Sequence, residues 1–182
     1  GGLLVNTAGV TSHGVGRTVM VENGAATFVK AALVTGAFFD VLGVRPALGR
    51  TITRDDDIDG AEHVLVLSHG LWQRRYGGSR EVLGRRVLLG EQPFTIVGVM
   101  PPDVGYPRGV EVWRTVRSVP ATGPLGDAAR QEVNLIARLP PGVTIAQATG
   151  ELTVLGKQLD AKAASNVPKD LRRVVRSFED VV

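Results

Sequence analysis

The start of the chain, residues 3–33, alternates between short β-prone runs and turn signals, and two of these runs are joined by a tight-turn dipeptide. The first run covers residues 17–21 and the second residues 27–33. Asn23-Gly24 lies between them, and this dipeptide favours the backbone of a two-residue hairpin turn. The pattern predicts a β-hairpin, and a third β-prone run at residues 3–5 predicts a strand before it.

The middle of the chain predicts two helices separated by a buried strand. Residues 36–42 have the pattern of a short helix, and Gly43 is placed to end it. Residues 64–67 are all apolar, and this run is short enough for a buried strand. Ser68 follows as a natural N-cap for a helix over residues 69–76, which a Gly-Gly pair then ends.

A second hairpin and a long irregular stretch are predicted next. Residues 87–89 and 94–97 are β-prone and flank Gly90-Glu91-Gln92-Pro93, which has the composition of a turn. Residues 101–128 are rich in proline and glycine, with one apolar island at residues 110–113. This composition predicts a loop or a chain crossing between lobes.

The clearest helical periodicity lies near the end of the chain. Thr144 and Gln147 have the spacing of a capping box at the helix start. Strands predicted at residues 133–138 and 171–177 flank the helix, and such a strand-helix-strand unit can bury its apolar stripe only against a sheet. The stripe consists of residues at alternating three- and four-residue steps: Ile145, Ala148, Leu152, Leu155 and Leu159.

The composition is that of a folded protein, and the elements together predict an α+β fold. The chain has 182 residues, of which 43% are hydrophobic and 21% charged, so one compact body with two lobes is expected. The absence of cysteine excludes disulfides, thiolate metal sites and a cysteine nucleophile. No apolar run reaches the roughly 18 residues that a membrane-spanning helix needs.

The charge is weakly basic and is concentrated in arginines. The formal net charge is +3, from 21 basic and 18 acidic side chains, and aromatic residues make up only 5% of the chain, so nucleic-acid binding is not favoured. Arg74, Arg75, Arg85 and Arg86 form the candidate interaction surface. A solvated basic face is the simplest interpretation of these arginines, and an acidic partner or anionic lipid headgroups are the functional ones.

One acidic run resembles the start of a calcium-binding loop. Asp55, Asp57, Asp59 and Gly60 have the opening spacing of such a loop. The acidic residue that should close it would fall on Val66, inside the predicted strand. We therefore expect an exposed acidic loop, with a calcium site as the less favoured alternative.

A nucleophile beside a base is the other chemical motif to consider. Ser68 and His69 are adjacent, but a nucleophile elbow needs glycine where Val66 stands, so the N-cap role is favoured for the serine. The three histidines, His13, His63 and His69, lack the spacing of metal ligands, and we expect surface or packing roles for them. No phosphate-loop lysine follows a glycine cluster, so nucleotide binding is not expected.

Several motifs follow one another in a distinctive order. The longest is Val-Thr-Gly-Ala-Phe-Phe-Asp-Val-Leu-Gly-Val-Arg-Pro-Ala-Leu-Gly-Arg at residues 34–50. Shorter ones follow at residues 66–72, 76–78, 83–84, 96–101 and 137–143. Their order resembles that in the periplasmic core domain of MacB-type ABC transporter permeases, of the MacB/FtsX type, and the resemblance extends from Ala26 to the end of the chain.

The resemblance implies a two-lobed domain between the first and second transmembrane helices of a permease that has three helices after it. A porter-like lobe of strand-helix-strand units would comprise residues 1–35 and 128–182, and an inserted mixed α/β lobe would comprise residues 36–127. Such permeases dimerise and couple ATP hydrolysis by a separate subunit or domain to movement on the periplasmic side of the bacterial inner membrane. The implied partners are the rest of the permease, a second permease, the ATP-binding subunit and a periplasmic adaptor protein.

The leading hypothesis is a non-catalytic extracytoplasmic domain that transmits an ATP-driven conformational change to a periplasmic partner or substrate in an efflux or export transporter. It predicts no catalytic residue, cofactor or metal. One alternative is an extracytoplasmic module that binds a small ligand between two lobes. The other is a hydrolase that uses Ser68, His69 and an aspartate of residues 55–59.

Overall fold

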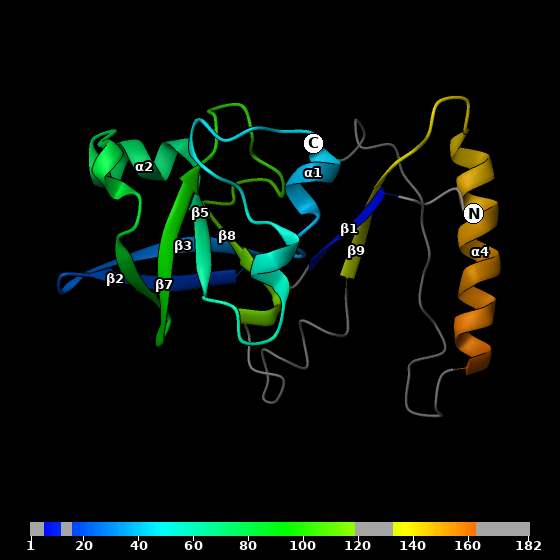
Figure 1. Cartoon of the computed structure of the whole chain (residues 1–182), viewed down its shortest axis with the longest axis horizontal. Coiled ribbons are helices and arrows are strands. Elements are labelled where there is room, and N and C mark those ends of the chain that lie inside the picture. Colours follow the sequence, from blue (N-terminus) through cyan, green and yellow to red (C-terminus); the bar gives the residue numbers. More distant parts are fainter. Residues whose placement is uncertain (1–5, 12–15, 119–132, 163–182) are drawn as a thin grey trace. The chain divides into compact units, whose positions relative to one another are not determined.

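The computed structural model describes residues 6–11, 16–118 and 133–162 (Figure 1). The described chain falls into two compact units. One runs from Thr7 to Ile136, and the other contains Asn6 and the residues from Ala137 onward. The fold is a mixed one with a sheet and few helices, in agreement with the α+β class that the sequence predicts.

Six strands of the first unit close on themselves to form a small barrel. Their order around the barrel is β2-β6-β7-β5-β8-β3, and a pairing between β2 and β3 completes the circle. The pairs β5–β7 and β3–β8 are parallel and the others are antiparallel. The strands are β2 (Gly16–Glu22), β3 (Ala25–Val34), β5 (Val64–Leu67), β6 (Arg86–Leu89), β7 (Gln92–Val99) and β8 (Val112–Thr115).

Further strands extend this sheet. β1 and β9 continue it beyond β3, and β4 pairs with β7. Their bounds are Asn6–Thr11 for β1, Leu48–Gly49 for β4 and Val133–Arg138 for β9. Three short 3-10 turns complete the connections: η1 (Arg54–Asp57), η2 (Arg80–Val82) and η3 (Val116–Ser118).

Most local predictions are confirmed. The first hairpin turns at Asn23 and Gly24, which both have positive φ, at 49° and 78°. α1 (Phe38–Leu42) ends at Gly43 in the left-handed conformation, and α2 (His69–Tyr76) begins after Ser68, whose hydroxyl accepts from the Leu71 amide. The second hairpin is also present, with a tighter turn than expected because β7 already begins at Gln92.

One prediction for the middle of the chain is wrong. The apolar island at residues 110–113 was expected inside a loop, but β8 (Val112–Thr115) pairs with both β3 and β5 and is needed to close the barrel. The sequence around the island indicates a loop, because proline and glycine surround it and because the apolar run is short. Its strand conformation depends on partners far away in the sequence.

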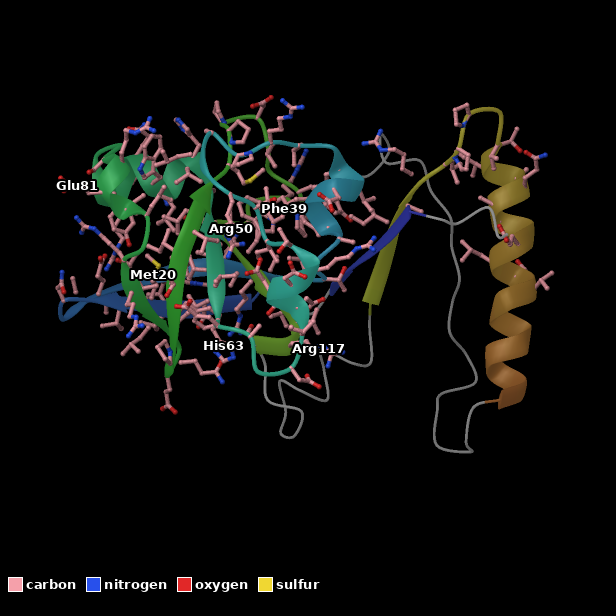
Figure 2. All side chains as sticks on the ribbon, in the orientation of Figure 1. Met20, Phe39, Arg50, His63, Glu81 and Arg117 are labelled. Carbon is pink, nitrogen blue, oxygen red and sulfur yellow. The ribbon has the colours of Figure 1, made fainter. Side chains whose placement is uncertain are left out.

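The inner face of the barrel forms one apolar core. Met20 on β2 marks it in Figure 2. Leu71 of α2 is buried in the same cluster, so this helix covers part of the barrel. The inward-facing strand residues are Met20, Val29, Ala31, Leu65, Leu67, Val87, Leu89, Phe94, Ile96 and Val112.

A second apolar cluster lies on the other face of β3, β8 and β5. Phe39 of α1 packs against Trp113 of β8 with ring centroids 5.9 Å apart, and Phe38 contacts Phe39 edge to face at 5.1 Å. The Trp113 indole is fully buried and donates its N–H to the Tyr106 carbonyl at 3.0 Å. α1 and the loop around Tyr106 therefore shield the part of the sheet that the barrel interior does not use.

The second unit contains the long C-terminal helix. α4 (Ile145–Lys162) is the helix predicted from the apolar stripe, and β9 is the strand predicted before it. The capping box is confirmed, because the Gln147 side chain accepts from the Thr144 amide at 2.8 Å and the Thr144 hydroxyl accepts from the Gln147 amide at 3.2 Å. The strands predicted at residues 3–5 and 171–177 lie outside the described residues, as does His13.

Candidate interaction surface

The four arginines predicted as an interaction surface do not share one environment. Arg74 and Arg75 lie in the last turn of α2. The Arg74 side chain is 61% exposed and forms an ion pair with Glu111. The Arg75 side chain is only 13% exposed and points to the first hairpin, where it contacts Glu22, the Thr27 hydroxyl and a backbone carbonyl.

Glu22 connects two of these arginines. One of its carboxylate oxygens lies 3.8 Å from Nε of Arg75, and the other lies 3.5 Å from Nη1 of Arg85. Arg85 also lies over the Tyr76 ring, 5.8 Å from its centroid. Burial, together with the nearby Glu22 carboxylate, raises the pKa of Tyr76 to about 12. These contacts hold α2 against the barrel. Arg75 and Arg85 therefore have a structural role in the domain.

Arg86 differs from the other three. It is exposed at the start of β6, and among the described residues no carboxylate lies within ion-pair distance of it. It borders a hollow of about 310 Å³ on the outside of the barrel. The other residues that line this hollow are Ala61, Glu62, His63, Pro93, Phe94 and Thr95.

The hollow is built by a short loop that lies beside β7. The His63 ring stacks on Phe94 with centroids 5.3 Å apart, and the Thr95 hydroxyl donates to the Glu62 carboxylate. A second, smaller hollow of about 100 Å³ lies next to it and shares His63 and Ala61. His63 therefore has the packing role expected for the histidines.

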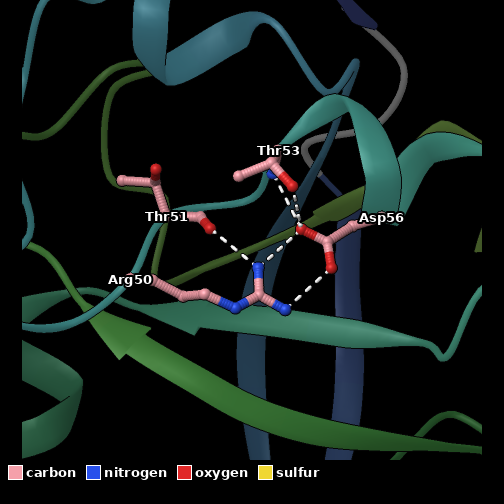
Figure 3. Close-up of polar contacts among 4 residues, drawn as sticks. All are labelled: Arg50, Thr51, Thr53 and Asp56. Atoms are coloured by element: carbon pink, nitrogen blue, oxygen red, sulfur yellow. Dashed lines mark hydrogen bonds and ion pairs between the residues drawn. The ribbon is translucent and has the colours of Figure 1, made fainter.

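The acidic run forms η1 and the turn after it. Asp57 accepts from the Gly36 amide at 2.9 Å, and Asp59 pairs with Arg117 at 2.8 Å. Asp56, between them, binds both terminal nitrogens of Arg50 and the Thr53 amide (Figure 3). Each of these carboxylates has its own protein donor, and no group of three or more metal-ligating side chains is found in the part of the chain that the structure describes.

Ser68 and His69 are both engaged in local structure. The Ser68 hydroxyl accepts from the Leu71 amide at 3.2 Å, which satisfies one of the free N–H groups at the start of α2. The His69 ring packs edge-on against Trp72, with centroids 5.5 Å apart. The geometry supports the N-cap role that the sequence favours over a nucleophile.

Arg114 is a charged group inside the barrel that the sequence did not reveal. Arg114 has the same strand parity as Val112, and its guanidinium carbon lies 5.5 Å from the centroid of the buried Phe94 ring. Its Nε is buried without a hydrogen-bond partner, and burial lowers the pKa of Arg114 to about 10. No ion pair to Arg114 is present among the described residues.

The family comparison matches most of the chain. The model of the MacB-like periplasmic core domain covers residues 5–155. A search of curated proteins gave no match. In the described residues, no helix has the length and apolar character that crossing a membrane requires.

Solved structures with the same fold come from transporter proteins. The periplasmic region of MacB from Actinobacillus actinomycetemcomitans has a TM-score of 0.66 at 19% identity, over 87% of this chain and 69% of that one. The extracellular domain of the noncanonic ABC-type transporter YknZ from Gram-positive bacteria has a TM-score of 0.65 at 16% identity, over 91% and 80%. A domain of a permease-like protein from Porphyromonas gingivalis has a TM-score of 0.61 at 22% identity, over 86% and 71%. None of these matches indicates an enzyme family.

Proposed function

This chain belongs to the MacB-like periplasmic core domain family, and from that premise we propose that it transmits an ATP-driven conformational change to a partner or substrate outside the membrane. It is a periplasmic domain of an ABC-type transporter permease. The match of the family model to residues 5–155 is the observation that carries the proposal.

The closed barrel supports transmission as a rigid body. Every strand of the circle has a hydrogen-bonded neighbour on both sides, and apolar side chains fill most of its interior, with Arg114 as a charged exception. Packed cores resist continuous deformation, so a push at one end of such a body moves the whole of it. A domain of this kind is suited to pass on a movement that arises elsewhere.

The proposal includes two lobes and the partners of an export transporter. We propose that the porter-like lobe comprises residues 1–35 and 128–182 and that the inserted lobe comprises residues 36–127, as the family resemblance implies. In the structure β2 and β3 share one compact unit with β5 to β8. We place the domain on the periplasmic side of the inner membrane, in a dimeric permease that works with an ATP-binding subunit and a periplasmic adaptor.

Exposed arginines are the proposed contacts to a partner. Arg74 and Arg86 are the most accessible of the four, whereas Arg75 and Arg85 already bind Glu22. Neutralising Arg86 should leave the fold intact and weaken partner binding. Unchanged binding in this variant would show that Arg86 is not part of the interaction surface.

Distance measurements in the whole permease test the transmission. The chain has no cysteine, so spin labels can be introduced at chosen positions. A pair at Glu91 and Arg108 reports on the barrel unit alone, and a pair from Glu91 to the membrane part of the permease reports on its movement. ATP should change the second distance and leave the first unchanged. A constant second distance, or a parent reading frame without one apolar span before this domain and three after it, would contradict the proposal.

A further inference from the structure

One side of the barrel exposes apolar side chains across four neighbouring strands. Ala26, Val21, Leu88 and Pro93 are direct register partners from β3 through β2 and β6 to β7, so they form a continuous row. Phe28 and Val19 pair beside this row. We call these six residues the outer apolar face.

Two large apolar side chains of this face are unusually exposed to solvent. Phe28 is 65% exposed and Leu88 is 42% exposed. Their strand neighbours Val29, Val87 and Leu89 point inward and are buried. Side chains that alternate along these strands thus fill the core inside the barrel and form an apolar surface outside it. Clustered, exposed apolar residues mark interaction sites.

The charges around the outer apolar face are basic. Arg17, Lys30 and Arg86 occupy outward positions on the same strands, and the Arg17 guanidinium lies over the Phe28 ring at 5.0 Å. No outward position of β2, β3, β6 or β7 carries a carboxylate. Glu91 in the β6–β7 turn and Glu62 in the hollow border the face.

The hollow beside β7 continues this surface. Pro93 belongs both to the apolar row and to the wall of the hollow, and Arg86 lies at the same wall. A volume of about 310 Å³ is in the range of sites that receive a large side chain or a small ligand. An apolar side chain in the hollow would place a neighbouring carboxylate within reach of Arg86.

The closed barrel limits how a partner can bind here. β2, β6 and β7 each have strand neighbours on both sides, so this side has no free edge to which a further strand could add. Binding must therefore use side chains on the sheet face. Aromatic and arginine anchors are the residues most often dominant in such interfaces. Phe28 on this face, and Arg17 and Arg86 beside it, are residues of these kinds.

We propose that the outer apolar face and the adjoining hollow bind a partner protein whose docking face has an apolar centre surrounded by carboxylates. The inference rests on the proposed function, because it names the surface through which the domain would act on its partner. A second copy of this face would bring like charges together, which is unfavourable. A membrane surface fits less well, because Glu62 and Glu91 at the border of the face would meet anionic headgroups.

Photo-crosslinking in the intact transporter tests the surface. A benzophenone amino acid replaces Phe28 or Leu88 in the full permease in its native membrane, and Ile58, which is 59% exposed elsewhere on the unit, is the control position. The expected product is one protein, cross-linked from both test positions and not from Ile58. Products with lipid only, with a second permease only, or no product at all would overturn the proposal.

Charge reversal decides whether the contact is specific. Arg17→Glu combined with Arg86→Glu should lower the cross-link yield about tenfold, and lysine substitution of carboxylates on the captured protein should restore it. A yield that the reversal does not change would also overturn the proposal. The spin-label distances in the same variant distinguish failure of this docking proposal from failure of the proposed transmission. ATP should still move the domain when docking is lost.

Discussion

Arg50 and Asp56 form a two-pronged ion pair between the segment after β4 and the turn η1. Nη1 of Arg50 donates to one carboxylate oxygen at 2.6 Å and Nη2 donates to the other at 2.8 Å (Figure 3). The Asp56 side chain is 10% exposed and also accepts from the Thr53 amide. Burial opposes ionisation of Asp56, but the bonds from Arg50 and Thr53 outweigh it and hold the pKa of Asp56 below its ordinary value.

Asp56→Asn should therefore destabilise the protein at neutral pH. The loss expected in the free energy of unfolding is about 1–3 kcal/mol, because a hydrogen-bonded charge pair is broken. The control is Asp59→Asn, since Asp59 is 90% exposed in its pair with Arg117 and should cost less than about 1 kcal/mol. Urea unfolding of both variants measures the difference.

The pH dependence of this loss has a definite sign. A lowered folded-state pKa gives stability that is fully present above the ordinary pKa of 3.8 and is lost as the pH falls. The stability difference between wild type and Asp56→Asn should thus shrink as the pH drops below 3.8. A difference that is constant with pH would show that the charge of Asp56 is not the cause.

Gly98→Ala should distort the contact between β7 and the segment that carries Arg50. A Cβ at Gly98 would lie 1.9 Å from the Arg50 carbonyl oxygen, so the backbone has to move. Overpacking of this kind costs about 1–3 kcal/mol, and more where the backbone cannot yield. Gly105→Ala is the matched control because its Cβ would meet nothing within 4 Å, and its melting temperature should stay the same or rise slightly. Equal melting temperatures for both variants would contradict the expectation.

The hairpins and helices could be predicted from the sequence because their signals are local. Asn23-Gly24 forces a turn by backbone preference, and Ser68 satisfies an amide only three residues away. Strand boundaries at residues 64–67 and 133–138 were also correct. Such features need no knowledge of what lies across the sheet.

Closure of the barrel could not be predicted, because it depends on pairings between distant strands. β2 meets β6, and β3 meets β8, across dozens of residues with no local signal. For the same reason the four arginines look equivalent in the sequence. Only the fold shows that Arg75 is turned toward Glu22 and that Arg86 is exposed beside the hollow.

Arg114→Met should leave the stability unchanged or raise it. The guanidinium is partly buried over Phe94 with an unsatisfied Nε, and an unpaired charge in such a place is costly. Methionine is shorter than arginine, but it keeps an unbranched apolar side chain beside the ring and removes the charge. We expect a gain of about 0–4 kcal/mol in the free energy of unfolding. Arg117→Met, an exposed control, should change it by less than about 0.5 kcal/mol. A loss larger than that of the control would mean that Arg114 has a stabilising partner.

Tyr76→Phe should change the stability profile at high pH. The pKa of Tyr76 is raised from 10.0 to about 12 in the folded state, so its phenol contributes stability below pH 10 that is lost as the pH rises toward 12. The decline of wild-type stability over this window should be steeper than that of the variant. Parallel profiles would mean that Tyr76 titrates equally in the folded and unfolded chain.

Ser68 gives a test that separates a structural from a catalytic role. Ser68→Ala removes the acceptor for the Leu71 amide and should lower the free energy of unfolding by about 0.5–2 kcal/mol, as for other N-caps. Ser68→Asp should restore most of this loss, because a carboxylate caps a helix start as well as a hydroxyl does and also suits the helix dipole. Thermal melts of both variants measure the effect, and transport by the intact permease should follow stability. If the aspartate variant were stable and yet inactive, Ser68 would have a chemical role that the cap does not explain.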